Sequence, residues 1–223
     1  MSNIFKFSVG KKLIVSLAGL FLITFLIVHL GINMLLIFME SNEAFNKAAH
    51  FMATNKIIKS MEIILFGGFL VHIIFSVVVN IQNMLARPIG YKVKNNSQTS
   101  FFSKYMFHTA FIIAIFLVLH LFDFYLKAKL FGDIGEVIYD GEHYHDLGTL
   151  VIARFKIWWV DVIYIIALLA LGFHLHHGFQ SAFQTIGLNH PVYTPIVKAI
   201  GVIYSVIVTV GFISIPIVIY FLK

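Results

Sequence analysis

Five long stretches of the sequence contain no Asp, Glu, Lys or Arg, and each is 18 to 26 residues long. A helix needs about 20 apolar residues to cross about 30 Å of hydrocarbon. Backbone polar groups in lipid must be bonded within their own segment, which favours helices over open strands. The sequence therefore predicts an all-α integral membrane protein with five transmembrane helices. The charge-free windows are Leu13–Phe38, Ile63–Ala86, Tyr105–Phe122, Val162–Ile186 and Ala199–Leu222.

Composition supports this class. Hydrophobic residues make up 60% of the chain and charged residues 12%, whereas soluble domains have about 25% charged residues. There is no cysteine, which excludes disulfides, thiolate zinc sites, covalently attached c-type haem and iron–sulfur clusters held by this chain. We expect one transmembrane domain over residues 1–223, with helices at about 13–38, 58–86, 104–126, 157–186 and 194–222.

The distribution of cations predicts the orientation. With the N-terminus inside, residues 1–12, 87–104 and 187–198 lie in the cytoplasm and hold eight Lys or Arg and no acid. The other extramembrane residues hold eight cations as well, but over a longer stretch and with all ten acids. Cation density therefore favours a cytoplasmic N-terminus. The net charge of +6 suits anionic lipid headgroups or an acidic partner and requires no nucleic acid.

The longest connection, Asp123–Asp161, is acidic, and its Gly-Asp pairs indicate turns. We interpret it as a solvated outer loop, with a weak metal site at His143 and His145 as the alternative.

Histidine is concentrated in the windows, which hold seven of the eleven His residues. Imidazole in lipid needs a partner, and for any one His that partner can simply be a neighbouring helix. However, each of the first four helices carries a His well inside its span, and the fifth carries none. Four axial ligands are what two bis-His haems need in a bundle core. Zinc and di-iron sites normally add thiols or carboxylates, which the windows lack. The seven residues are His29, His72, His108, His120, His174, His176 and His177.

The sequence therefore predicts a five-helix bundle with two b-type haems in its core, but depth leaves the pairing open. Counted from the cytoplasmic ends, His29 and His120 lie 17 and 16 residues in, while His72 and His174 lie 15 and about 13 residues in. That spread is too small to settle which His residues share a haem. Glycines near these His residues fit either a flat macrocycle or ordinary helix packing. They are Gly31, Gly67, Gly68, Gly172 and Gly178.

Several local motifs resemble one family. The segment EAFNKAAHFM, Glu43–Met52, is the most specific of them. The chain as a whole resembles the dihaem cytochrome b membrane subunit of succinate dehydrogenases and quinol:fumarate reductases, of the single-chain, five-helix type. The other motifs are IVHLGIN with His29, FLVHIIFS with His72, VLHLFD with His120 and GFHLHHGFQS with His174.

The resemblance implies the ligand pairs. His72 and His174 would hold the haem b nearer the cytoplasm, and His29 and His120 the distal one. His177 lies one turn from His174 and is the alternative ligand or a propionate contact.

The resemblance also implies the function, which is electron transfer between an iron–sulfur subunit and menaquinone in the bacterial cytoplasmic membrane. An FAD-containing flavoprotein subunit would oxidise succinate or reduce fumarate, so this chain would not itself transform either compound. The iron–sulfur subunit would dock on the cytoplasmic face, at Arg87, Lys92, Lys94 and Lys104.

Quinone candidates lie at the predicted outer end, near the distal haem. They are Glu40, Glu43 and His50, and for the two acids a solvated loop position is an equally good interpretation. Trp158 and Trp159 fit membrane-interface aromatics better than quinone contacts. Some family members have a Glu linked to transmembrane proton movement where this chain has Gly172.

Two other functions stay open at this stage. One is a bis-His cytochrome b of a hydrogenase or formate dehydrogenase. The other is a haem-free transporter, which would have polar or broken helices with acids near the midplane. Pro216 is the only proline in the windows, and the windows contain no acid.

Overall fold

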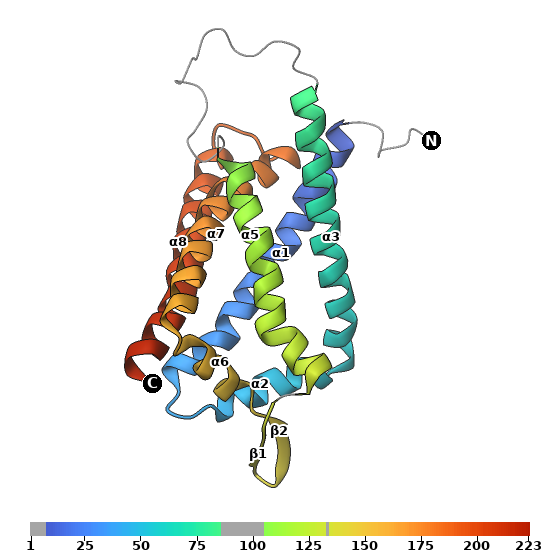
Figure 1. The fold of residues 1–223 in the computed structure, drawn as a ribbon. Coiled ribbons are helices and arrows are strands. Elements are labelled where there is room, and N and C mark those ends of the chain that lie inside the picture. Colours follow the sequence, from blue (N-terminus) through green and yellow to red (C-terminus); the bar gives the residue numbers. More distant parts are fainter. Residues whose placement is uncertain (1–7, 86–104, 133) are drawn as a thin grey trace.

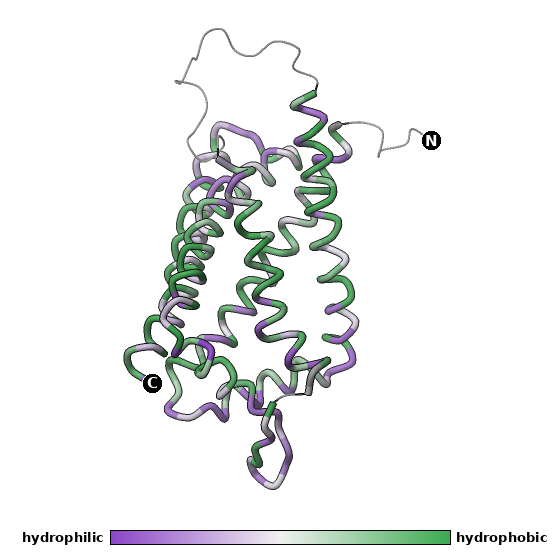
Figure 2. The backbone as a smooth tube through the Cα atoms, viewed as in Figure 1, coloured by the Kyte–Doolittle hydropathy of each residue, from purple (hydrophilic) through white to green (hydrophobic). Residues whose placement is uncertain are grey.

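The computed structural model describes residues 8–85, 105–132 and 134–223. Five of its helices are long and apolar enough to cross a membrane, which confirms the prediction of five membrane-length helices. They run side by side (Figure 1), apolar along their middle parts and more polar toward the ends (Figure 2). The spans are α1 (Ser8–Phe38), α3 (Lys56–Leu85), α5 (Met106–His120) with its continuation η2 (Leu121–Phe131), α7 (Trp158–Thr185) and α8 (Tyr193–Leu222).

The helices extend beyond the charge-free windows. Lys11 lies in the first turn of α1, Glu62 in α3 and Asp161 in α7. Charged side chains near a helix end can reach the interface or a partner, so they do not stop the helix. The predicted helix ends at 86 and 104 lie outside the described residues.

The third span changes its hydrogen-bonding pattern midway. α5 is an α-helix up to His120, and the next 11 residues form the π-helix η2. Gly132, with φ of 60°, follows the end of η2. A π-helix has a wider turn than an α-helix and is uncommon, and many occur at functional sites.

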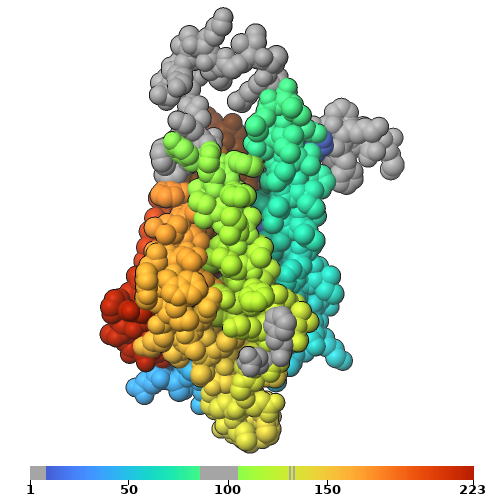
Figure 3. Space-filling view, in the orientation of Figure 1, coloured from blue at the N-terminus to red at the C-terminus, as the bar shows by residue number. Residues whose placement is uncertain are grey.

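One end of the bundle is covered by short elements, and we call it the hairpin end (Figures 1 and 3). Strands β1 and β2 pair antiparallel, and Asp140 and Gly141 join them with φ of 53° and 81°. Two positive φ values are typical of a two-residue type I′ turn, which confirms a turn at this Asp-Gly pair. The segment predicted as a solvated loop thus holds ordered structure. The elements are α2 (Glu43–Thr54), β1 (Glu136–Tyr139), β2 (Glu142–His145) and α6 (Leu147–Phe155).

The helices do not pack evenly around the bundle. α1 packs against α3, α7 and α8, and α7 also packs against α5 and α8. α3 packs along α1 and α2, and none of its residues is buried. Within the described chain, α3 has no comparable packing against α5 or α7. By their main contacts, the first four spans follow the order α3, α1, α7, α5, and α8 packs outside α1 and α7. α3 also meets the third span at η2, where Glu62 pairs with Lys129.

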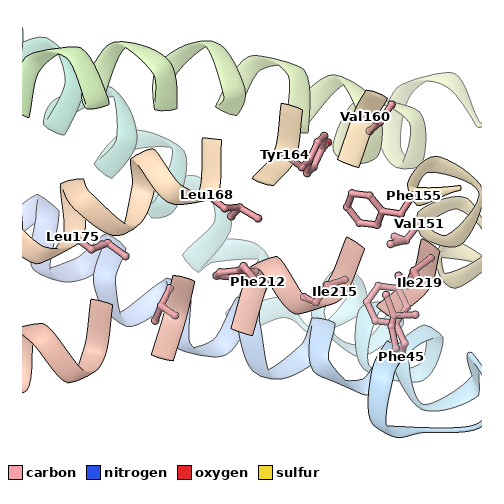
Figure 4. Close-up of a cluster of buried hydrophobic side chains, with 12 residues drawn as sticks. Phe45, Val151, Phe155, Val160, Tyr164, Leu168, Leu175, Phe212, Ile215 and Ile219 are labelled. Carbon is pink, nitrogen blue, oxygen red and sulfur yellow. The ribbon is translucent and has the colours of Figure 1, made fainter. Parts of the chain in front are cut away.

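The apolar core lies mainly where α7 and α8 meet α1, α2 and α6 (Figure 4). Figure 4 shows Tyr164 and Phe155 within this cluster, and their ring centres are 5.1 Å apart. Leu36 of α1 and Ile219 of α8 are fully buried there. This core fixes α7, which carries one of the predicted haem ligands.

Glycines allow two of the helix contacts. A Cβ on Gly172 of α7 would lie 3.0 Å from Cγ2 of Thr209 on α8, and one on Gly68 of α3 would lie 3.2 Å from the ring of Phe21 on α1. These two glycines therefore serve close helix packing. Gly67, by contrast, has no atom within 4 Å of such a Cβ.

This difference predicts opposite effects of one substitution at two positions. Gly172→Ala should lower the free energy of unfolding by about 1–3 kcal/mol, since Thr209 is β-branched and its hydroxyl already donates to the Ser205 carbonyl at 2.6 Å. Gly67→Ala should be neutral or stabilising by about 0.5–1 kcal/mol, because Ala is the better helix former. Thermal unfolding in detergent, followed by circular dichroism, measures both. Equal melting temperatures for the two variants would contradict the packing described.

Candidate functional site

Four histidines from four helices face one another in two pairs. The ring centres of His29 on α1 and His120 at the end of α5 are 5.7 Å apart, with an interplanar angle of 90°. The ring centres of His72 on α3 and His174 on α7 are 6.3 Å apart, with an interplanar angle of 76°. These are the two pairs that the family resemblance implies.

The pairs lie at different levels of the bundle. α3 and α7 both begin at the hairpin end, and His72 and His174 each lie 16 residues beyond the first residue, or roughly 24 Å along the axis. His29 lies nine residues before the end of α1, which reaches the same end, so it is roughly 14 Å away. The His29–His120 pair is therefore nearer the hairpin end, in agreement with the weak depth ordering in the sequence.

The surroundings of His72 fix its ring. Its Nδ1 lies 3.1 Å from the carbonyl oxygen of Val15 on α1. Gly19, one turn further along α1, makes room for the ring, because a Cβ there would lie 3.2 Å from Cε1 of His72. A hydrogen bond donated by one ring nitrogen to a backbone carbonyl orients many metal-binding histidines and leaves the other nitrogen free for the metal. Gly19 thus helps to position His72, a role that the sequence alone did not suggest.

The His29–His120 pair lies among aromatic rings. Phe25 stacks on His29 at 5.2 Å, and the Phe212 ring of α8 lies 5.6 Å from it. His120 contacts Phe124 at 5.3 Å, and the Tyr164 ring lies 6.3 Å away. The rings around this pair are therefore mainly aromatic.

Two ring nitrogens are buried without a hydrogen bond among the described groups, namely Nδ1 of His120 and Nδ1 of His174. Buried polar atoms usually have a partner, so each such exception needs an explanation. One of these nitrogens belongs to each pair. Each level of the bundle therefore contains a histidine ring nitrogen that is buried without a hydrogen-bond partner among the described groups.

The donor set favours one kind of metal centre. Each site offers two imidazoles, and among the described residues no group of three or more His, Cys, Asp or Glu could hold an ion. Haem brings four nitrogen ligands of its own and needs only two from the protein. At metal–nitrogen distances of about 2.0–2.1 Å, two imidazoles on opposite sides of one ion have ring centres about 6 Å apart. The residues present therefore fit two bis-His haems.

The other intramembrane histidines lie less centrally. His108 is exposed near the start of α5, with its ring 5.8 Å from that of Tyr105. His177 is half-buried on α7, one turn beyond His174. The structure thus brings His174, rather than His177, to within ring contact of His72.

The quinone candidates separate from one another. Glu43 forms an ion pair with Lys47 at 2.7 Å, and Lys47 also pairs with Asp140 of the hairpin turn. Hydrogen bonds to Asp140 and Glu43 raise the pKa of Lys47 above its ordinary value. Glu40 is exposed and precedes α2.

Of the three, His50 lines a cavity with a volume of about 220 Å³. Its ring also contacts that of Tyr144 at 5.0 Å. The lining residues are Ala49, His50, Ala53, Thr54, His145 and Leu147.

The EAFNKAAHFM segment is helix α2, and its Asn46 joins the short elements of the hairpin end. Asn46 is 1% exposed, donates to Oδ1 of Asp146 at 2.9 Å, and accepts from the Gly148 backbone N–H at 2.8 Å. It also donates to the Tyr139 hydroxyl at 3.3 Å. One amide side chain therefore connects α2 with the hairpin and with the start of α6.

A buried polar cluster near His120 was missed by the sequence interpretation. Asp123 accepts from Arg154 of α6 at 2.8 Å and from the Tyr164 hydroxyl of α7 at 2.9 Å. Asp161 is also buried, and its Oδ1 has no hydrogen bond among the described groups. The signal was present at the window edges, because Asp123 directly follows the third charge-free window and Asp161 directly precedes the fourth.

Comparisons of the chain with protein-family models, curated proteins and solved structures find no match.

Removing the Asn46 amide should destabilise the hairpin end. Asn46→Ala leaves the buried Gly148 N–H without its partner and removes one of two hydrogen bonds to Oδ1 of Asp146, at a cost of about 1–3 kcal/mol in the free energy of unfolding. Chemical denaturation in detergent measures the change. Lys47→Ala on the same helix is the matched control and should have little effect, because its ion pairs are exposed. An Asn46→Ala protein as stable as the Lys47→Ala protein would contradict this role.

The hydrogen bonds of Asp146 predict that the free energy of unfolding decreases at acid pH. Burial alone would raise its pKa, but hydrogen bonds from Thr149 and Asn46 outweigh burial and hold the pKa below the ordinary value of 3.8. A lowered pKa in the folded state stabilises the protein above the unfolded pKa, and this contribution is lost as the pH falls below about 4. Wild-type protein should therefore lose stability between pH 5 and 3 more steeply than Asp146→Asn. Parallel melting-temperature profiles of the two proteins over this range would refute the prediction.

Proposed function

We propose that this chain is the dihaem cytochrome b membrane subunit of a succinate dehydrogenase or fumarate reductase complex. In this role it carries electrons between an iron–sulfur subunit and menaquinone in the bacterial cytoplasmic membrane. The observation that carries the proposal is the two-level arrangement of facing imidazoles, supplied by four of five membrane-length helices.

The four histidines would hold the two haems. His29 and His120 would hold the haem nearer the hairpin end, and His72 and His174 would hold the haem farther from it. Haem b, when bound, supplies reversible one-electron chemistry. Two levels of ligands divide the thickness of the membrane into shorter electron-transfer steps.

The chain's own residues orient the ligands and exclude water. Val15 accepts from the His72 ring, and Gly19 leaves room for that ring beside α1. Phe25 and Phe212 pack on His29, and Phe124 packs on His120. Such outer contacts influence ligand orientation and reduction potential.

The cavity at His50 is the best-supported menaquinone site of the three candidates. An imidazole can donate a hydrogen bond to a quinone carbonyl and can carry a proton. His145 contributes a second imidazole to the same cavity. Glu43 is engaged with Lys47 and is the weaker candidate.

The proposed partners are an FAD-containing flavoprotein subunit and an iron–sulfur subunit. The absence of cysteine requires that any iron–sulfur cluster in the complex belong to another chain. The proposed docking residues between 87 and 104 lie outside the described part of the structure.

Haem content tests the proposal directly. The purified complex should contain two low-spin b haems per chain, measured by pyridine haemochrome and by reduced-minus-oxidised spectra. His29→Ala should retain one of the two haems, because it removes a ligand from only one pair. His108→Ala is the matched control and should retain both, since its side chain is exposed and lies outside both pairs. A wild-type protein without haem would overturn the proposal.

Partner chemistry separates the proposed complex from other cytochrome b complexes. Succinate added to membranes that contain the complex should reduce its b haems, and malonate should block that reduction. Haem reduction by formate or hydrogen, but not by succinate, would identify the subunit as part of a different oxidoreductase.

A further inference from the structure

The buried polar cluster beside His120 has a role that the haem ligands do not explain. We name the three residues Asp123, Arg154 and Tyr164 the Asp123 network. Asp123 lies in the first turn of η2, three residues after His120, and its side chain is 7% exposed. One carboxylate oxygen accepts from Arg154 at 2.8 Å, and the other accepts from Tyr164 at 2.9 Å.

Aromatic rings connect the network with the His29–His120 pair. Tyr164 donates to Asp123, and its ring lies 6.3 Å from the His120 ring. The ring centre of Phe124 lies 5.3 Å from that of His120 and 6.3 Å from that of Tyr164. Aromatic side chains screen charge much less than water does, so these charges act on their surroundings at a low effective dielectric constant.

A purely structural role explains the network poorly. A buried ion pair loses much of its Coulomb energy to desolvation, so it is weak evidence for stability. Moreover, η2 already has a second ion pair on its other side, between Lys129 and Glu62 of α3 at 2.5 Å. Those two side chains are 37% and 24% exposed and are therefore better hydrated than Asp123.

The network also distinguishes the two levels of the bundle. The ion pairs of the described residues all lie toward the hairpin end. Among them, only the Asp123–Arg154 pair connects with a predicted haem ligand, because Asp123 accepts a hydrogen bond from Tyr164, whose ring contacts that of His120. The His72 ring, at the other level, has a backbone carbonyl as its polar neighbour. Among the described residues, the two levels therefore differ in the ion pairs that lie near them.

We propose that the Asp123 network sets the reduction potential of the haem held between His29 and His120, with Asp123 and Arg154 acting as opposed fixed charges. The inference rests on the proposed haem function. Reduction adds one negative charge at the iron, so a nearby cation favours the reduced form and a nearby anion favours the oxidised form. The Tyr164 hydrogen bond weakens the field of the Asp123 carboxylate.

Opposed charges predict opposite shifts. Asp123→Asn leaves Arg154 uncompensated and should raise the midpoint potential of one haem. Arg154→Gln leaves Asp123 uncompensated and should lower it, and Tyr164→Phe should lower it by less. The double variant Asp123→Asn/Arg154→Gln should lie between the two single variants and close to wild type. Potentiometric titration of the α-bands in the purified complex measures each value.

Two sets of controls show which haem changes its midpoint potential and whether buried charge causes the change. The affected component should be the one missing from the His29→Ala protein, while the other haem keeps its potential. Glu62→Gln and Lys129→Gln remove the more exposed pair on the same π-helix and should shift the potential less, because water screens it. If Asp123→Asn does not retain both haems, the Tyr164→Phe variant provides the test. Its midpoint potential should be lower than that of wild type, and a higher value would contradict the inference.

Three results would overturn the inference in a protein that retains both haems. They are shifts of the same sign in Asp123→Asn and Arg154→Gln, equal shifts of both haems, and no shift in any of the variants. A wild-type protein without haem would instead refute the proposed function, so the two failures can be told apart.

Discussion

The structure depends on one constraint, which is that polar groups inside hydrocarbon must find their partners within the protein. Five long helices satisfy the backbone. The imidazoles of four helices meet in two pairs, and the single carboxylate of the third span, Asp123, binds an arginine and a tyrosine. At the hairpin end, one buried amide satisfies three neighbouring groups. These buried polar groups therefore mark contacts between particular helices, whereas Oδ1 of Asp161 has no hydrogen bond among the described groups.

Much of the fold was predictable because lipid imposes a simple pattern on the sequence. The long charge-free windows located all five spans. Four of the histidines within these windows are the ones whose rings face each other in two pairs. The same pattern hides two buried acids, because a charge-free window ends at the first charged residue. The third window ends one residue before Asp123, and the fourth begins one residue after Asp161. Both carboxylates are buried, and neither could be recognised as such without its neighbours.

Pairing and local structure needed the three-dimensional contacts. Depth differed too little among the four histidines to separate two levels, whereas helix adjacency does so directly. The role of Asn46 could not be read from its own segment, because its partners lie about 100 residues further along the chain. The π-helix that follows His120 has no distinctive composition, since its residues are ordinary in an α-helix. Long-range partners and helix type therefore account for most of what the sequence left open.

The loose attachment of α3 would link the proposed haem site to the assembly of the bundle. Among the described elements, α3 packs mainly on α1 and α2, meets η2 through Glu62 and buries none of its residues. It carries His72, whose partner His174 lies on α7, the membrane-length helix with the largest buried share. A ligand bound by both rings would bridge α3 and α7, which have no comparable direct packing in the described chain. Such a ligand binds the closed bundle and not the opened one, so by mass action it would stabilise the closed form. Cofactor supply would then limit how much of the chain completes folding in the membrane.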